Sequence, residues 1–345
     1  MDVKKIEKKY QNYETNKAIR LIAMELGNDY NEKEKAEEYL KKIDVKTLTE
    51  KDKMLLSGVY LNLGLLEKGF DFYRFRKHDY QIPFDRKKEW NKENLTGKKI
   101  YIVAEQGIGD CIMWARFLPL LKNTNIFFYV SNQFHKNIIF LLDYVLKLTA
   151  RNNNVHVVDY ITDYDYFIYL ADLTYIFKVH FDNWVPFYTY IQSDTKFTKL
   201  WKEKLPKNKK LIAINCTGID GQQDHRKIEF HEIMPLLECD QFVFININID
   251  FKVQHRNVLN FELDKTQPFI DTCAIIHCVD LVVTIDTSIV HLAGAMNAKT
   301  LLLLKKNSEW RWFDDKVSRW YPAVTILKEW GKIVTCTLSL LECQN

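Results

Sequence analysis

Residues 100–119 read IYIVAEQGIGDCIMWARFLP. The first five are apolar and β-type and the last ten fit an amphipathic helix, so the stretch predicts a strand that turns directly into a helix. Gly107 and Gly109 allow positive φ in this turn and the close approach of a ligand. The helix start offers free N–H groups and a positive dipole end, which suit a diphosphate or a carboxylate. Asp110 lies at the carboxyl end of the strand, where open α/β sheets place their ligands. A plain strand–helix corner is the alternative interpretation.

A second stretch, residues 280–304, reads DLVVTIDTSIVHLAGAMNAKTLLLL. Its pattern predicts a strand, a polar turn, a helix and another strand. Asp286 can cap this helix, while Thr287 and Ser288 place hydroxyls beside its free amides. His291 follows three residues after Ser288 and lies near the same helix start. The alternative is a capped helix with a histidine that faces the core.

Three segments together resemble a known family. They are AEQGIGDCIMWARFLPLL at 104–121, VVTIDTSIVHLAGAMNAKTLLLL at 282–304 and EWRWFDDKVSRWYPAVTILKE at 309–329. They resemble bacterial tetratricopeptide-repeat proteins with a glycosyltransferase-like domain, which are related to the lipopolysaccharide heptosyltransferases of glycosyltransferase family nine. The resemblance implies the GT-B fold, in which two Rossmann-like domains face a cleft, and transfer of a sugar from a nucleotide-sugar donor without a metal.

The resemblance also implies roles for the two motifs. Asp110 matches the family's aspartate after the Gly-x-Gly turn, which acts as the base on the acceptor hydroxyl. A helix-starting N-cap is the alternative role for Asp110. The donor's diphosphate and sugar would be held by both turns, through Gly107, Gly109, Asp286, Thr287, Ser288 and His291.

Two further segments supply candidate donor contacts. Residues 215–227 read NCTGIDGQQDHRK and resemble the family's loop of a glycine followed by a basic residue that faces the leaving diphosphate. Gly218 with Arg226 or Lys227 would fill those roles, and an exposed pair of loop charges is the alternative. Trp310 and Arg311 would stack on a base or sugar and pair with a phosphate, or else form a packed interdomain wedge.

Composition limits the classes of function. With 47% hydrophobic and 27% charged residues, the 345-residue chain is typical of globular proteins of two or three domains. Its net charge of +4 is too mild to indicate a nucleic-acid partner. We expect no signal peptide or membrane span, because the start is charged and every apolar run is too short. The seven cysteines lack a C-x-x-C pair, which predicts reduced thiols and no zinc site. Cys111 as a nucleophile is not favoured, since no histidine adjoins it.

The pattern of apolar residues predicts four regions. Residues 1–80 form a helical, tetratricopeptide-like region in which Gly64 can end one helix, and 81–97 form a polar linker. Residues 98–197 form an acceptor-side Rossmann-like domain and 198–345 a donor-side one. The polar stretch 198–210 is expected to separate them. The predicted strands are 99–104, 126–130, 155–158, 166–169, 211–216, 241–247, 281–285 and 300–304. The predicted helices of the two domains are 110–121, 133–148, 230–238, 268–277 and 288–296.

The sequence thus predicts an α/β protein of the GT-B fold and a cytoplasmic, inverting hexosyl- or heptosyltransferase with no cofactor. Its acceptor would be a glycan, a lipid-linked sugar or a protein; peripheral contact with a membrane and a protein partner of the helical repeats stay open. The D-x-D pattern at Asp163 and Asp165 is not favoured as a metal site. Residues 246–251 (NINIDF) depart from the family's nucleotide-contacting loop. Three alternatives follow: Asn248 or Asp250 substitutes, the donor differs from the usual one, or catalysis is lost. The rivals are a non-catalytic scaffold and a Rossmann-type oxidoreductase, which Ile112 disfavours because it replaces a required third glycine.

Overall fold

The computed structural model of the chain describes residues 3–28, 32–77, 83–121, 124–130, 154–180, 189–216, 228, 230–249, 251–266, 269–305, 309–313 and 315–342. The chain divides into two compact units. The helical unit comprises Met1–Asp85, Asp172–Val185 and Glu309–Phe313, and the α/β unit comprises Arg86–Ala171, Pro186–Ser308 and Asp314–Asn345. These units are defined by contacts between residues and not by the limits of each sheet. The division into four regions therefore stays a prediction.

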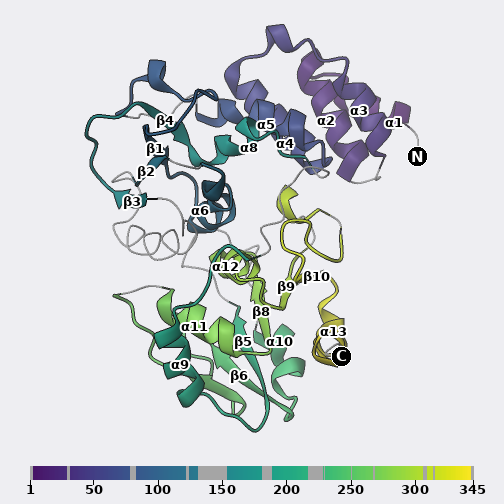
Figure 1. Cartoon of the computed structure of the whole chain (residues 1–345). Coiled ribbons are helices and arrows are strands. Elements are labelled where there is room, and N and C mark those ends of the chain that lie inside the picture. The colour runs from purple at the N-terminus through teal and green to yellow at the C-terminus, as the bar shows by residue number, and fades with distance from the viewer. Residues whose placement is uncertain are drawn as a thin grey trace. The chain divides into compact units, whose positions relative to one another are not determined.

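The helical unit is built around α1 (Val3–Tyr10), α2 (Thr15–Asn28), α3 (Lys33–Leu40), α4 (Glu50–Asn62), α5 (Leu66–Tyr73) and α8 (Leu173–Ile176) (Figure 1). Its core gathers apolar side chains that recur along these helices, among them Ile22, Leu26, Leu40, Leu56 and Val59. Gly64 follows α4 with a φ of 78°, which agrees with its predicted place at a helix end. The helical prediction is confirmed, and an organisation in tetratricopeptide repeats stays a prediction.

A buried ion cluster joins the 3-10 turn Arg74–Lys77 to the residue that precedes α8. Asp172 accepts hydrogen bonds from Arg76 Nη1 and Lys77 Nζ, both at 2.6 Å. The side chains of Asp172 and Arg76 are each 3% exposed. Burial alone would raise the pKa of Asp172, but the two cations outweigh it and hold that pKa below its usual value.

The first sheet of the α/β unit has the strand order β3-β2-β1-β4, with every pair parallel. Its strands are β1 (Lys99–Val103), β2 (Asn125–Tyr129), β3 (Asn154–Val158) and β4 (Tyr166–Tyr169), as predicted. The helix predicted at 110–121 is shorter, because α6 (Ile108–Ala115) gives way to a 3-10 turn at Leu118–Leu120 that contains Pro119. The helix predicted at 133–148 lies outside the described residues.

The second sheet has the order β10-β9-β8-β5-β6-β7 and is also parallel. Its strands are β5 (Lys210–Asn215), β6 (Phe242–Asn246), β7 (Val258–Asn260), β8 (Leu281–Ile285), β9 (Thr300–Leu303) and β10 (Val324–Leu327). The helices around it are α9 (Thr195–Lys204), α10 (Phe230–Leu237), α11 (Ile270–Cys278), α12 (Ser288–Ala295) and α13 (Ile333–Glu342). Figure 1 shows α9 and α11 on one side of the strands and α10 and α13 on the other. Two layers of helices therefore cover a parallel sheet, as in doubly wound folds.

Several segments differ from their prediction, among them α13, which the pattern did not predict. The polar stretch expected between the domains begins inside α9, because Asp194 caps this helix and Trp201 is buried with its Nε1 2.6 Å from Asp271 Oδ1. Trp90 of the predicted linker is buried, and its backbone N–H donates to the carbonyl oxygen of Phe167 at 2.8 Å. This segment therefore borders β4. The short strands β7 and β10 were not predicted, since runs of three or four residues carry little pattern.

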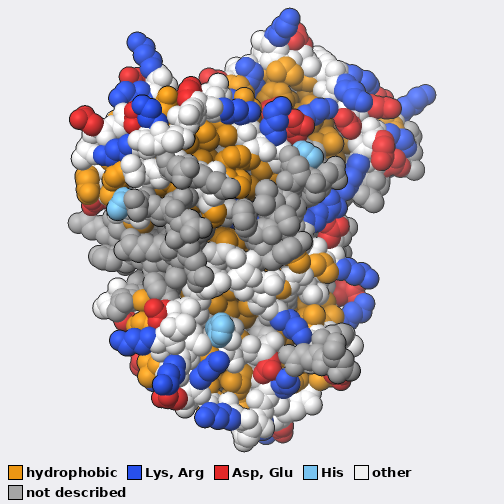
Figure 2. Space-filling view, in the orientation of Figure 1, with side chains coloured by type: hydrophobic (Ala, Val, Ile, Leu, Met, Phe, Trp, Pro, Cys, Tyr) orange, Lys and Arg blue, Asp and Glu red, His pale blue; other side chains and the backbone are white. Residues whose placement is uncertain are grey.

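The surface mixes both signs of charge. On the face drawn in Figure 2, Lys and Arg side chains are interspersed with Asp and Glu over both units. Among the described helices, none has the length and apolar character that crossing a membrane requires.

We predict that Asp172→Asn lowers the free energy of unfolding by about 3–5 kcal/mol, because it removes the carboxylate that two buried cations share. The folded-state pKa of Asp172 is depressed, so its stabilisation is fully present above the unfolded value of about 3.9 and is lost as pH falls through the folded value. Urea unfolding at pH 7 and at pH 3 measures the effect. The difference in the free energy of unfolding between wild type and variant should be smaller at pH 3 than at pH 7.

Glu37→Gln is the control for this prediction. Glu37 pairs with Lys68 at 3.0 Å in the same unit, but the two side chains are 31% and 49% exposed. We expect this variant to lose less than about 1 kcal/mol. Equal losses in the two variants would contradict a special role for the buried cluster.

Candidate functional site

The first motif forms the predicted strand–turn–helix corner from β1 to α6. Gly107 is the N-cap of α6 and has an extended backbone with φ of −102°. The residue with positive φ is Gln106, at 62°. The expectation that Gly107 and Gly109 supply positive φ is therefore wrong, and the reason for a glycine at 109 lies in its packing.

Asp110 is the third residue of α6 and is half-buried. Its Oδ2 accepts the backbone N–H of Gly107 at 3.0 Å, so the carboxylate closes the helix start. Asp110 is thus a capping residue without being the N-cap itself. Its assignment as a base stays a prediction.

The second motif places α12 directly after β8. Thr287 is the N-cap, and its Oγ1 accepts the N–H of Ile289 at 3.3 Å. The expectation that Asp286 caps the helix is wrong, because Asp286 precedes the cap position and is only 8% exposed. Ser288 begins the helix and remains half-buried.

The first turns of α6 and α12 touch each other. A Cβ atom on Gly109 would lie 2.7 Å from Cδ2 of His291 and 3.5 Å from Cα of Ser288, so only glycine fits without a shift. The two motifs, which lie 180 residues apart in sequence, therefore meet at one place in the α/β unit (Figure 1). The structure brings together Gly109, His291 and Ser288, and the neighbours Asp110 and Thr287 lie next to them in sequence.

The imidazole of His291 is positioned by a hydrogen bond with Tyr321. The His291 Nδ1 lies 3.0 Å from the Tyr321 hydroxyl, and the imidazole is 5% exposed. Burial raises the pKa of Tyr321 well above its ordinary value, so the phenol stays protonated. A Cβ on Gly294 would lie 2.3 Å from Cγ of Tyr321, so this glycine makes room for the ring. The core-facing histidine considered for this position is thus present, and it also borders the first motif.

Arg116 is a buried member of this region that the sequence analysis missed. It is 1% exposed, and its Nε and Nη1 donate to the carbonyls of Met113 at 2.8 Å and Trp320 at 3.1 Å. Its guanidinium also lies 4.7 Å from the Tyr321 ring centroid. The signal was a lone charge inside the apolar run CIMWARFLPLL, since a cation there needs buried partners.

Asn215 is the second residue that the sequence analysis did not assign to a site. It ends β5, and its Oδ1 accepts the hydroxyl of Thr287 at 3.0 Å. The asparagine is 6% exposed. The start of α12 is therefore connected to the neighbouring strand by a side-chain hydrogen bond.

Trp310 and Arg311 belong to the helical unit and not to the α/β unit that holds α6 and α12. The Trp310 ring packs edge-on against Phe70 at 6.0 Å and Tyr73 at 6.5 Å. Arg311 pairs with Glu309, and its guanidinium lies 4.9 Å from the Trp310 ring. Both residues therefore pack within the helical unit, while the interdomain wedge and a role in donor binding stay predictions.

Gly218, Arg226, Lys227 and Asp250 lie outside the described residues. The carboxylate of Asp165 accepts the N–H of Lys99 and pairs with Lys98, both at 2.9 Å, and these contacts lower its pKa. Among the described residues, no group of three or more His, Cys, Asp or Glu side chains could hold a metal ion.

Cys111 lies inside the protein beneath the first motif. Its Sγ is 3.6 Å from the carbonyl oxygen of Glu105, and burial raises the pKa of the thiol. A fully buried thiol with a raised pKa is a poor nucleophile, which disfavours this alternative. Glu105 is 4% exposed and accepts the N–H of Ala171 at 3.1 Å, so it orders the turn.

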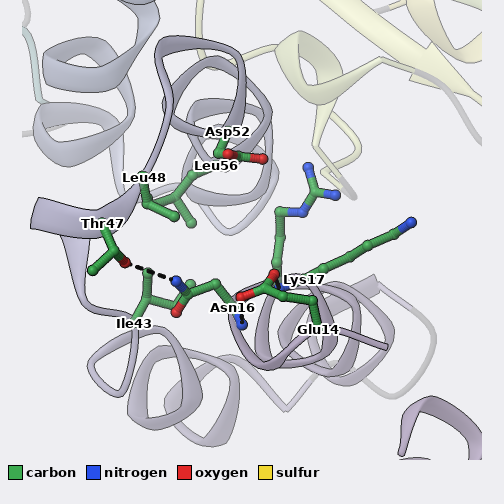
Figure 3. Close-up of a pocket in the computed structure, with 9 residues that line it drawn as sticks. Glu14, Asn16, Lys17, Ile43, Thr47, Leu48, Asp52 and Leu56 are labelled. Atoms are coloured by element: carbon green, nitrogen blue, oxygen red, sulfur yellow. Dashed lines mark hydrogen bonds between the residues drawn. The ribbon is translucent and has the colours of Figure 1, made fainter. Parts of the chain in front are cut away.

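The helical unit contains a separate pocket of about 140 Å³ (Figure 3). It is lined by Glu14, Asn16, Lys17, Arg20, Ile43, Thr47, Leu48, Asp52 and Leu56. Glu14 accepts the N–H groups of Asn16 and Lys17 at 3.1 Å each, and Asp52 accepts that of Thr49 at 3.2 Å. Both carboxylates therefore serve the starts of α2 and α4, which leaves Lys17 and Arg20 as the cations of the rim.

Comparison with known proteins supports the fold. No family model matches the chain. Over 300 residues the chain is 23% identical to Protein FlbA of Caulobacter vibrioides, a match that covers 77% of this chain and 50% of that protein. The chain thus spans about half the length of this curated relative.

Several solved structures resemble the chain. The ADP-heptose lipopolysaccharide heptosyltransferase II of E. coli gives a TM-score of 0.52 at 11% identity, over 71% of this chain and 98% of that one. A family 9 glycosyl transferase from Veillonella parvula gives a TM-score of 0.47 at 11% identity, over 72% and 91%. The likeness to the E. coli protein, with the two parallel sheets, shows a GT-B-type α/β fold.

We predict that Gly109→Ala lowers the free energy of unfolding by about 1–3 kcal/mol, because the added methyl group overlaps the imidazole of His291. His291→Ala in the same chain should relieve this overlap. Urea unfolding of the two single variants and the double variant should then give a coupling energy of about 0.5–3 kcal/mol.

Gly58→Ala is the matched control, because no atom lies within 4 Å of a Cβ placed on this α4 glycine. This variant should be neutral or more stable by about 0.5–1 kcal/mol. Additive losses for Gly109→Ala and His291→Ala would show that the two helix starts do not touch in solution.

Proposed function

We propose that this protein is a glycosyltransferase that moves a sugar from a nucleotide-sugar donor to a hydroxyl-bearing acceptor, without a metal and with inversion. The observation that carries the proposal is the contact between the starts of α6 and α12 through Gly109 and His291. Two helix N-termini at one place favour an anionic ligand, since each offers N–H groups and a positive dipole end. The GT-B-type fold shared with the E. coli heptosyltransferase supports a nucleotide sugar as that ligand.

In the proposed reaction Asp110 accepts the proton of the acceptor hydroxyl. The acceptor oxygen then forms a bond to the anomeric carbon of the donor while the bond from that carbon to the diphosphate oxygen breaks. The negative charge that develops on the leaving diphosphate is stabilised by the N–H groups of α12 and the hydroxyl of Ser288. Arg226 or Lys227 would add positive charge there.

The acceptor is a glycan, a lipid-linked sugar or a protein. A protein partner bound through the helical unit, peripheral contact with a membrane and a cytoplasmic location belong to the same proposal. The name of the E. coli protein makes ADP-linked sugars the first donors to try, followed by UDP, GDP, CMP and TDP sugars.

We predict that one of these donors stabilises the wild-type protein in metal-free buffer. At about 100 times its Kd a ligand adds about 2.7 kcal/mol to stability, which a thermal-shift assay detects. Ser288→Ala should reduce the shift. Thr287→Ala also removes a helix cap worth about 1 kcal/mol, so the ligand-induced shift and not the melting temperature of the free protein is compared. No shift with any donor would favour the non-catalytic scaffold.

Asp110→Asn separates the base from the cap. The amide oxygen of asparagine can still accept the Gly107 N–H, so we expect the folded stability and donor binding to be retained. Loss of the base should lower kcat by about 10²–10⁴-fold in a transfer or donor-hydrolysis assay. Asp110→Ala is the control, since it loses the cap as well and should also be less stable. Full activity of Asp110→Asn would leave Asp110 with the capping role alone.

A further inference from the structure

Three asparagines end three adjacent strands of the second sheet. Asn215 is the last residue of β5, Asn246 of β6 and Asn260 of β7. The strands are parallel and neighbouring, and Asn246 lies directly opposite Asn260 in the register. Their side chains therefore line the carboxyl edge of the sheet, the edge from which α12 starts.

These residues and Asn248 form a continuous chain of amide hydrogen bonds, which we call the asparagine chain. Asn215 Nδ2 donates to Asn248 Oδ1 at 2.8 Å. Asn248 Nδ2 donates to Asn246 Oδ1 at 2.6 Å, and Asn246 Nδ2 donates to Asn260 Oδ1 at 2.8 Å. Asn215, Asn248 and Asn246 thus donate toward β7 and accept from the side of β8, so the orientation of one amide sets that of the next.

The asparagine chain ends on the two threonines beside α12. Asn215 Oδ1 accepts the hydroxyls of Thr287 at 3.0 Å and Thr284 at 3.2 Å. The Thr287 hydroxyl oxygen also accepts the N–H of Ile289. The Thr287 hydroxyl therefore donates its proton to Asn215 and uses a lone pair to cap α12. Thr287 therefore holds the helix start, and Ser288 is the hydroxyl of this turn that remains for a ligand.

We propose that Asn215 is a positioning residue of the nucleotide-sugar site, which orients Thr287 and with it the first turn of α12. The asparagine chain keeps the Asn215 amide in the orientation that accepts the Thr287 proton. This inference rests on the proposed function, since it needs α12 to hold the donor diphosphate. It also gives a role to the residues NINIDF, in which Asn246 and Asn248 support Asn215 in place of a direct nucleotide contact.

The test uses the full chain and isothermal titration with ADP, UDP and GDP. We expect Asn215→Ala to raise the Kd of the diphosphate that binds wild type about tenfold. A change of this size corresponds to the loss of about one well-oriented hydrogen bond to the ligand. Asn248→Ala should have a smaller effect in the same direction, because Thr287 keeps its acceptor. Each variant is checked for folding by circular dichroism before titration.

Asn257→Ala is the matched control. Asn257 precedes β7, and its amide bonds to Leu237 O at 2.9 Å and Asp240 Oδ1 at 3.1 Å, outside the asparagine chain. It should lower thermal stability without changing the Kd. A Kd that rises equally in Asn257→Ala and Asn215→Ala would mean general destabilisation and would overturn the proposal.

Asn215→Asp supplies a readout that a merely structural residue would not give. A protonated aspartic acid can donate to Asn248 and accept from Thr287 as asparagine does, whereas the carboxylate cannot donate. An aspartic acid titrates near pH 3.9, and burial at a position that is 6% exposed should raise its pKa, so the ratio of its Kd to the wild-type Kd should fall as pH is lowered from 7 to 4. A constant ratio would contradict the positioning role.

The outcomes separate the two proposals. If wild type binds none of the diphosphates or their sugars, the proposed function fails and this inference fails with it. If wild type binds one of them and Asn215→Ala binds equally well, the donor site stands and the positioning role of Asn215 is wrong.

Discussion

The contact between Gly109 and the imidazole of His291 is the constraint on which the candidate site depends. It joins the first turn of α6, which follows the first sheet, to the first turn of α12, which follows the second. Two positive helix ends at one place repel each other unless negative groups lie nearby. Asp110 supplies one such group at the start of α6. Asp286, which directly precedes the N-cap of α12 and is buried, is a second such group. In the proposed function the donor diphosphate binds at the same place.

Buried polar side chains around this contact fix the positions of His291 and of the two helix starts. Tyr321 holds His291, and Arg116 ties α6 to the backbone of Trp320. From the other side Asn215 holds Thr287. The groups that would face a ligand are thus mainly backbone N–H groups and Ser288, whereas the larger polar side chains orient the helix starts. Pre-oriented N–H groups lose little free energy through reorganisation when charge develops on a leaving group.

The helical unit depends on a different interaction. Segments 172–185 and 309–313, which interrupt the α/β part of the sequence, belong to this unit. In this unit Asp172 is the counter-ion of Arg76 and Lys77, and the Trp310 ring packs against Phe70 and Tyr73. The hydrophobic core of the helices comes from residues 3–72, and these two segments add contacts to α5 and to the 3-10 turn that follows it.

Local pattern was sufficient for the fold class. Short β-branched and aromatic runs alternating with helices predicted both parallel sheets, and the two strand–turn–helix corners were recognised because strand end, turn and helix start are adjacent in sequence. The same corners marked Gly109, Thr287, Ser288 and His291 as neighbours within each motif. Errors at this level were small: β7 and β10 are too short to show a period, and α9 carries so many lysines that its buried Trp201 was overlooked.

What each of these residues does depends on partners far away in sequence. Gly109 is needed for the imidazole 182 positions later and not for its own φ, and Asn215 matters because sheet register sets it beside Asn248 and Thr287. Arg116 is tolerated only because distant carbonyls and rings surround it. The resemblance places Trp310 at the donor pocket, and only the structure shows that its ring packs against Phe70 and Tyr73 of α5. Propensity and periodicity act over a few residues, whereas register and close packing join segments that no local rule connects.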